Sequence, residues 1–231
     1  KNDYELTKKL GEDKVWSYQR TVGLPATILR PGPIYGPRSK YTHTLLFATQ
    51  SLLARSKKPV ALRISDGPYC HHVHVHDVAR AAVLLMQLPR TIGNAYNCCD
   101  QTPVKWSKLF DLSAELSGVE IGRSFPWNRH LAKMVIPLLD KLVPQKKLNQ
   151  LNEHLKQEWQ ALSEDQELRP ALRPRIERDT LGYLRGDHVY DISSLEELGF
   201  NWKYPNTLDG LRDTYRWLVE NRWIPTPVNR N

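Results

Sequence analysis

The alternation of helical and strand-like segments constrains the fold of this chain more than any other feature of its sequence. Residues 3–22 carry an approximate apolar stripe at helical spacing and end at Gly23-Leu24-Pro25, and residues 26–30 are a short apolar run stopped by Pro31-Gly32-Pro33. Further helices are expected over 44–54, 78–88 and 104–117, and further strands over 60–64, 72–76 and 94–99. Helices alternating with strands through short connections predict an α/β fold with a parallel sheet.

The sequence changes character from about Phe125. Residues 129–143 are apolar at helical spacing but interrupted by Pro137, and the highly charged residues 146–168 also predict a helix. A last helix is expected over 208–221. An alternating helix–strand part is therefore followed by a mostly helical part.

Composition narrows the class of protein. No run approaches the ~20 apolar residues of a membrane span, and the start shows no signal-peptide pattern. The three cysteines make no disulfide framework and indicate a reducing, cytoplasmic compartment. The net charge of +8 is spread among acidic residues, which favours a solvated surface over a nucleic-acid site, with an anionic small ligand as the second interpretation. Because the first residue is Lys, we expect a fragment, a processed product or a trimmed chain.

A tyrosine and a lysine near the first residue form a candidate acid/base pair. Tyr4 and Lys8 stand four residues apart in the first expected helix, so their side chains share one face. A phenol has a pKa near ~10 and is a poor base at neutral pH, whereas a neighbouring cation favours the phenolate. The same spacing is also typical of an ordinary amphipathic helix, so the pair alone does not establish a site.

Four motifs follow one another along the chain, and a fifth lies near its end. They are Tyr4-x-x-x-Lys8; Leu29-Arg30-Pro31-Gly32-Pro33-Ile34-Tyr35-Gly36; His74-Val75-His76-Asp77; Gly93-Asn94-Ala95-Tyr96-Asn97; and Tyr190-Asp191-Ile192-Ser193. Together they resemble the second half of the extended short-chain dehydrogenase/reductases, the NAD-dependent epimerase/dehydratase family. The resemblance covers most of the chain and is weakest over residues 120–180.

The resemblance implies a partial Rossmann-type parallel sheet with a smaller, interleaved substrate-binding part. Residues 1–119 would be the C-terminal portion of the NAD(P)-binding domain, with a substrate-loop excursion at about 38–72. Residues 120–231 would be the mostly helical substrate-binding part. Many relatives dimerise through the helix that bears the tyrosine, so the resemblance also implies a homodimer.

The same resemblance implies roles for single residues. Tyr4 would be the catalytic acid/base, and Lys8 would hydrogen-bond the nicotinamide ribose and lower the tyrosine pKa. The segment of Pro31, Gly32, Pro33 and Ile34 would line the cofactor, with Pro33 also facing a small-molecule substrate. A rigid Pro/Gly turn without a ligand is an equal interpretation of this segment. Substrate contacts are further expected from Arg38 and Arg185.

Part of the family's machinery is missing from this sequence. No GxxGxxG occurs in the 231 residues, although the pyrophosphate of NAD(P) needs a glycine turn at a helix N-terminus. The residue that selects NAD or NADP and the upstream Ser/Thr of the catalytic triad are absent as well. We therefore predict that this chain alone is inactive and does not bind the dinucleotide tightly.

A metal site is the first competing hypothesis. His72, His74 and His76 would share one face of a strand, which suits zinc or nickel. However, His74 belongs to one of the family's own motifs, and no carboxylate or thiolate set completes a site. We expect no metal.

The substrate class is left open between two branches of the family. Nucleotide-sugar epimerases commonly carry an arginine where this chain has Cys70-His71-His72, so that anion contact is missing. Residues 173–191 instead resemble the steroid-dehydrogenase-like (3-beta-hydroxysteroid) branch. The apolar residues 131–143 would suit a lipid-like substrate or a membrane-surface contact, or would simply pack on the domain. A non-catalytic remnant that serves as an interaction protein is the alternative from another class.

Overall fold

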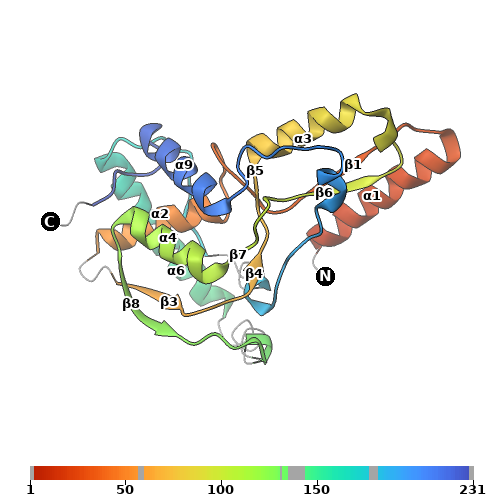
Figure 1. Ribbon diagram of the computed structural model, residues 1–231. Helices are drawn as coiled ribbons and strands as arrows, with labels where there is room; N and C mark the ends of the chain where they lie inside the picture. Colours follow the sequence, from red (N-terminus) through yellow and green to blue (C-terminus); the bar gives the residue numbers. More distant parts are fainter. Residues whose placement is uncertain (1–2, 57–59, 131, 135–143, 177–181, 229–231) are drawn as a thin grey trace.

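The structure is a computed structural model that describes residues 3–56, 60–130, 132–134, 144–176 and 182–228 (Figure 1). Its helices are α1 (Asp3–Val22), α2 (His43–Ala54), α3 (Val75–Gln87), α4 (Trp106–Ser117), α6 (Gln145–Asp165), α8 (Ser193–Glu196) and α9 (Thr207–Glu220), with 3-10 turns η1 (Pro89–Thr91) and η2 (Tyr183–Arg185). Its strands are β1 (Ile28–Pro31), β2 (Ile34–Tyr35), β3 (Val60–Ile64), β4 (Tyr69–Cys70), β5 (Val73–His74), β6 (Ala95–Cys98), β7 (Val104–Lys105) and β8 (Glu120–Phe125). The predicted α/β class is confirmed.

The strands pair mainly in the parallel sense, as the alternating pattern predicts. Within the described residues, β1 pairs with β6, β2 with β5 and β3 with β8 in parallel, whereas β4 and β7 are antiparallel. In the first pair Ile28 lies opposite Ala95 and Pro31 opposite Cys98. The described strands thus form separate two-stranded pairs, so helix packing contributes much of the support for the fold.

The strand expected over 72–76 is shorter than predicted, and this prediction was wrong in its second half. β5 ends at His74, and α3 begins at Val75. His74 caps the helix, because its Nδ1 accepts the backbone N–H of His76 at 3.1 Å. His72, His74 and His76 therefore do not share one face of a strand, and the geometry behind the metal hypothesis is absent.

Other boundaries moved by a few residues. The helix expected over 104–117 begins with the strand β7 and becomes helical only at Trp106; it ends at Gly118, which has a φ of 73°. The strand β8 was not predicted. The helix expected over 129–143 lies largely outside the described residues.

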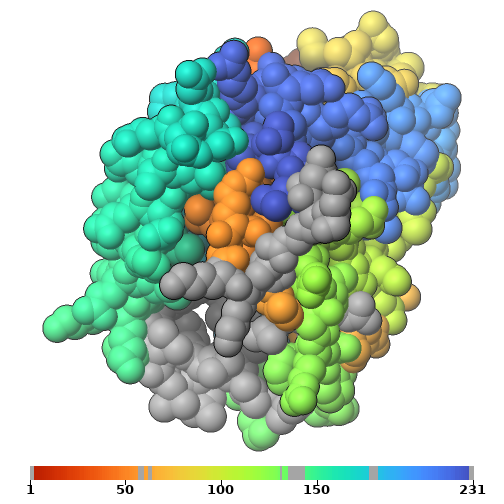
Figure 2. All heavy atoms as spheres, turned by 90° about the vertical axis from the view of Figure 1, so that its left-hand side faces the viewer, coloured from red at the N-terminus to blue at the C-terminus, as the bar shows by residue number. Residues whose placement is uncertain are grey.

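Among the described residues, buried side chains form three clusters, of which the two largest organise the molecule. The larger lies among α2, α4 and α9 and includes Phe47, Leu109 and Leu218. Figure 2 looks at this side of the molecule, where α6, α2, α4 and α9 are packed together. The smaller cluster joins α3 and β6 to residues 192–202 from the C-terminal part of the chain.

The helix α1 stands apart from both clusters. It lies at the edge of the molecule beside β1 and β6, away from α2, α4 and α9 (Figure 1). None of its residues is buried, and Tyr4, Leu10 and Val22 are among its exposed apolar side chains. No described helix has the length and apolar character that a bilayer crossing would require.

Candidate active site

The structure brings Tyr4 and Lys8 together at the start of α1. The ammonium nitrogen of Lys8 lies 5.3 Å from the centre of the Tyr4 ring, which is within cation–π range. Tyr4 is 68% exposed, so its hydroxyl is open to a reactant. The pair has the proximity and access that the acid/base prediction requires.

A second tyrosine–lysine pair lies further along the same helix. The Lys14 ammonium lies 4.8 Å from the centre of the Tyr18 ring, closer than in the first pair. Side chains four residues apart on a helix meet as a matter of course. Proximity alone therefore does not single out Tyr4, and Tyr18 provides a matched comparison.

An ion pair fixes α1 to the end of β1. Arg30 donates to Glu12 from its Nε at 3.0 Å and also from Nη2, and the Trp16 indole donates to the same carboxylate at 3.2 Å. The hydrogen bond from Arg30 is the main cause that lowers the pKa of Glu12. The Arg30-Pro31 motif thus helps to position the helix that carries Tyr4.

The segment after β1 is packed against protein on one side. The N–H of Gly32 donates to the Cys98 carbonyl at 3.0 Å. A Cβ at Gly32 would lie 2.5 Å from the carbonyl oxygen of His71 and 2.8 Å from the Cys99 sulfur. The Pro33 carbonyl accepts the N–H of Val73 at 3.2 Å. Close packing therefore accounts for a glycine at this position without a ligand.

The Asp77 carboxylate ties α3 to the C-terminal part of the chain. It accepts the backbone N–H groups of Lys203 and Tyr204, each at 2.8 Å, and pairs with Arg80 at 2.9 Å. The Asp77 side chain is fully buried. This motif residue therefore has a structural function in the present structure.

A buried network around Asp100 was missed by sequence reasoning. Its carboxylate accepts from the Tyr35 hydroxyl at 2.9 Å, the Thr207 hydroxyl at 2.8 Å and the His74 N–H at 3.2 Å. Burial raises the pKa of Asp100 to about 7. The only sequence signal was its position directly after a buried strand, and its partners lie too far along the chain to be inferred from spacing.

Residues 1–99 match the NAD dependent epimerase/dehydratase family. The resemblance drawn from the motifs is thus confirmed over the part that carries Tyr4, Lys8, Arg30 and Asp77. No curated protein matches the chain.

Solved structures of similar fold include several epimerases and a dehydratase. An epimerase of Methanothermobacter thermautotrophicus is 16% identical with a TM-score of 0.59, and the match covers 94% of this chain and 50% of that one. A UDP-glucose 4-epimerase of Thermotoga maritima with UDP-glucose is 18% identical, with a TM-score of 0.56 and coverages of 94% and 53%. A dTDP-glucose 4,6-dehydratase of Bacillus anthracis with NAD is 15% identical, with a TM-score of 0.58 and coverages of 96% and 53%. This chain spans about half the length of these structures, which establish its fold.

The residues present fit only one end of the dinucleotide that the epimerase/dehydratase family implies. The Tyr4 hydroxyl and the Lys8 ammonium are hydrogen-bonding groups suited to a nicotinamide ribose. At Gly32, the space that a missing side chain leaves is filled by His71 and Cys99. The glycine-rich turn that would hold the pyrophosphate does not occur in the sequence.

The two arginines expected at the substrate lie in two different turns of the chain, one after β2 and one in η2. Arg38 is exposed and has a φ of 65°, in the turn that follows β2. Arg185 is the exposed last residue of η2. Within the described part of the chain, neither forms an ion pair, so both are open to an anionic group.

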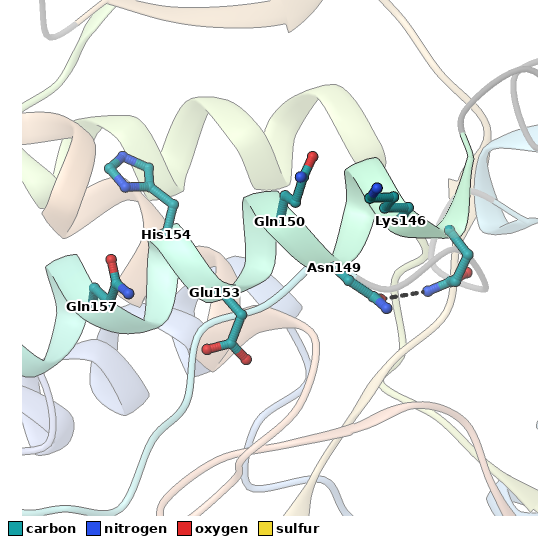
Figure 3. A pocket seen from close by; sticks show the side chains of 7 residues that line it. Lys146, Asn149, Gln150, Glu153, His154 and Gln157 are labelled. Carbon is teal, nitrogen blue, oxygen red and sulfur yellow. Dashed lines mark hydrogen bonds between the residues drawn. The ribbon is translucent and has the colours of Figure 1, made fainter.

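Neither a metal-ligand cluster nor a hollow along α6 adds to the site in the described part of the chain. Among the described residues, no three His, Cys, Asp or Glu side chains are grouped to hold a metal ion. The described residues that line this hollow all belong to α6 and include Lys146, Glu153 and His154 (Figure 3). One face of a single helix does not enclose a ligand.

Proposed function

We propose that this chain is part of an NAD(P)-dependent oxidoreductase of the epimerase/dehydratase type that acts on a secondary alcohol or ketone. The observation that carries the proposal is the exposed Tyr4 beside Lys8, inside the segment that matches the family. The similar structures that hold UDP-glucose and NAD support a small-molecule substrate and a dinucleotide. The missing glycine-rich turn supports inactivity of this chain alone.

The chemistry assigned to the chain's own residues is a proton transfer. The Tyr4 phenolate accepts the hydroxyl proton of the substrate during oxidation and returns it during reduction. The Lys8 ammonium beside the ring would donate a hydrogen bond to the nicotinamide ribose of a bound NAD(P). When bound, NAD(P) supplies the hydride acceptor or donor.

We further propose how the two parts of the chain divide cofactor and substrate binding. Residues 1–119 with Pro31 to Ile34 serve the cofactor side, and residues 120–231 with Arg185 serve the substrate side. Pro33 and Arg38 contribute to the substrate side from the first part. We place the enzyme in the cytoplasm as a homodimer, on the basis of its free, buried cysteines and the exposed α1.

The test compares two tyrosines of one helix in a longer polypeptide that includes this chain. Tyr4→Phe removes the proton-transferring hydroxyl, and we expect kcat to fall about 10²–10⁴-fold. Tyr18→Phe, which has the same lysine geometry, should retain wild-type turnover. Turnover is followed by NAD(P)H absorbance with UDP-glucose and with 2-decalol, a cyclic secondary alcohol. Equal turnover in the wild type and Tyr4→Phe would remove the tyrosine from its assigned role.

A further inference from the structure

A small pocket is walled by rings from three separate segments of the chain. We call it the aromatic pocket; it is lined by His71, His72, Trp106, Tyr183, His188 and Tyr190. These residues come from the connection between β4 and β5, from the start of α4, and from η2 and the loop after it. Pro33 of the cofactor-side segment also borders the pocket. Its walls therefore join the two parts of the chain.

Two buried polar atoms of residues that line this pocket have no partner among the described residues. They are the indole nitrogen of Trp106 and the Nδ1 of His72, in residues that are 4% and 1% exposed. A buried N–H or imidazole nitrogen without a hydrogen bond is costly and uncommon in native proteins. Both atoms are therefore candidates to bind a group that the chain itself does not supply.

The neighbouring His71 shows the opposite situation. Its Nδ1 accepts the backbone N–H of Tyr190 at 3.2 Å, and its Nε2 donates to the Asp100 carbonyl at 2.5 Å. His71 is therefore fixed as a wall and has no free nitrogen for a ligand. The unpartnered atoms are confined to Trp106 and His72 within the lining.

The described part of the lining carries none of the ordinary charged side chains. Among the residues that the structure describes, it contains no Lys, Arg, Asp or Glu, and Thr42 and Cys70 line it together with Pro33. Burial lowers the pKa values of His71 and His72, which keeps both rings neutral. A phosphate or carboxylate would find no counter-ion here, and burying it would be unfavourable.

The size of the pocket limits what enters it. It has room for about one water-sized group. Tyr183 and Tyr190 are 39% and 42% exposed, so their rings offer an apolar surface at the mouth.

We propose that the aromatic pocket binds the hydroxyl or carbonyl oxygen of an uncharged, ring-bearing ligand. The oxygen enters between Trp106, which donates a hydrogen bond, and His72, while the rings of the ligand lie on Tyr183 and Tyr190. If this ligand is the substrate, which rests on the proposed function, the substrate is an uncharged cyclic alcohol or ketone rather than a nucleotide sugar.

The experiment follows the indole N–H signal of Trp106 in the ¹⁵N-labelled 231-residue chain. We expect 2-decalone, an uncharged fused-ring ketone, to shift this signal saturably, while decalin, the same rings without oxygen, leaves it in place. UDP-glucose should not shift it either. The indole signal of Trp217 on α9, outside the pocket, is the internal control.

The variants test the two polar atoms directly. Trp106→Phe removes the N–H and keeps a ring, and we expect the dissociation constant for 2-decalone to rise about tenfold. His72→Phe serves as the second variant if Trp106→Phe does not fold. A Trp106 signal that 2-decalone leaves unmoved, a shift caused by UDP-glucose, or unchanged affinity in the folded variants would overturn the proposal. An unmoved signal would assign the space to a bound water.

The binding measurement needs neither cofactor nor turnover, so the two proposals fail separately. If 2-decalone binds but Tyr4→Phe retains turnover in the longer enzyme, the pocket assignment stands and the catalytic role is wrong. If Tyr4→Phe abolishes turnover of UDP-glucose and the Trp106 signal never moves, the catalytic role stands and the pocket assignment is wrong.

Discussion

The Asp77 carboxylate accepts the backbone N–H of Tyr204 at 2.8 Å, across 127 residues of sequence. The adjacent N–H of Lys203 donates to the other oxygen of the same carboxylate. An acidic residue at the start of α3 is also favoured by the helix dipole. One side chain thus stabilises the first turn of α3 and anchors the segment that leads to α9.

The first prediction concerns this anchor. Asp77→Ala leaves two N–H groups and Arg80 without their acceptor, and we expect the free energy of unfolding to fall by about 3 kcal/mol. Asp213→Ala, which removes an exposed pair of the same spacing with Arg216, should cost no more than about 0.5 kcal/mol. Urea unfolding measures both. Equal losses of unfolding free energy in the two variants would show that the buried contacts of Asp77 stabilise the protein no more than an exposed ion pair does.

The second prediction uses two glycines. Gly32→Ala places a Cβ against the His71 carbonyl and the Cys99 sulfur, and overpacking of this kind costs about 1–3 kcal/mol. Gly11→Ala on α1 meets nothing within 4 Å and should stabilise the helix by about 0.5–1 kcal/mol. Thermal unfolding of the two variants should therefore move in opposite directions. An unchanged or higher melting temperature for Gly32→Ala would contradict the close packing.

The third prediction concerns stability in acid. Complete burial lowers the pKa of His43 from 6.5 to about 4, so between these pH values the unfolded chain binds a proton that the folded chain does not. Stability is therefore full above pH 6.5 and is lost as the pH falls towards 4, by about 3 kcal/mol from this group.

His43→Phe should flatten this dependence, because the variant has no group to protonate at that position. Urea unfolding at several pH values across this range gives the slope for each protein. His154→Phe on the exposed face of α6 is the control and should keep the wild-type slope. A slope in His43→Phe as steep as in the wild type would show that other groups govern acid unfolding.

The fourth prediction concerns the dinucleotide. A calorimetric titration of the 231-residue chain with NADH or NADPH should show no saturable heat, because the sequence lacks the glycine turn that holds the pyrophosphate. Tight binding in the purified chain would mean that another segment holds the phosphates.

Local sequence patterns predicted the positions of the helices well. For the strands, they predicted parallel pairing but not which strands pair. The apolar stripe and Gly23 predicted α1 over the residues that the structure gives, and β3 was also placed correctly. The strand predicted over 72–76 was wrong in its second half. Alternation over so short a run also fits a strand that is followed directly by a helix. β8 was missed because its pairing with β3 is a long-range contact that local spacing does not encode.

The candidate site shows the same division. The four-residue spacing of Tyr4 and Lys8 correctly predicted that their side chains are close, because helix geometry alone brings residues at this spacing together. The unpartnered nitrogens of Trp106 and His72 could not be found this way, because the pocket forms only once the loop after η2 pairs with β4 through His188. Sequence spacing therefore predicts sites carried by one element better than sites assembled from several.

The exposed position of α1 has a consequence for how this protein would lose activity. Because the helix buries no residue and is held at β1 by Arg30 and Glu12, it can open locally at a smaller free-energy cost than the helices of the core. Tyr4, which we assign to catalysis, lies on α1 and is displaced when this helix opens. Heat or high salt would then inactivate the site while the core around Leu109 and Leu218 is still folded. Loss of activity would therefore not indicate that the whole protein has unfolded.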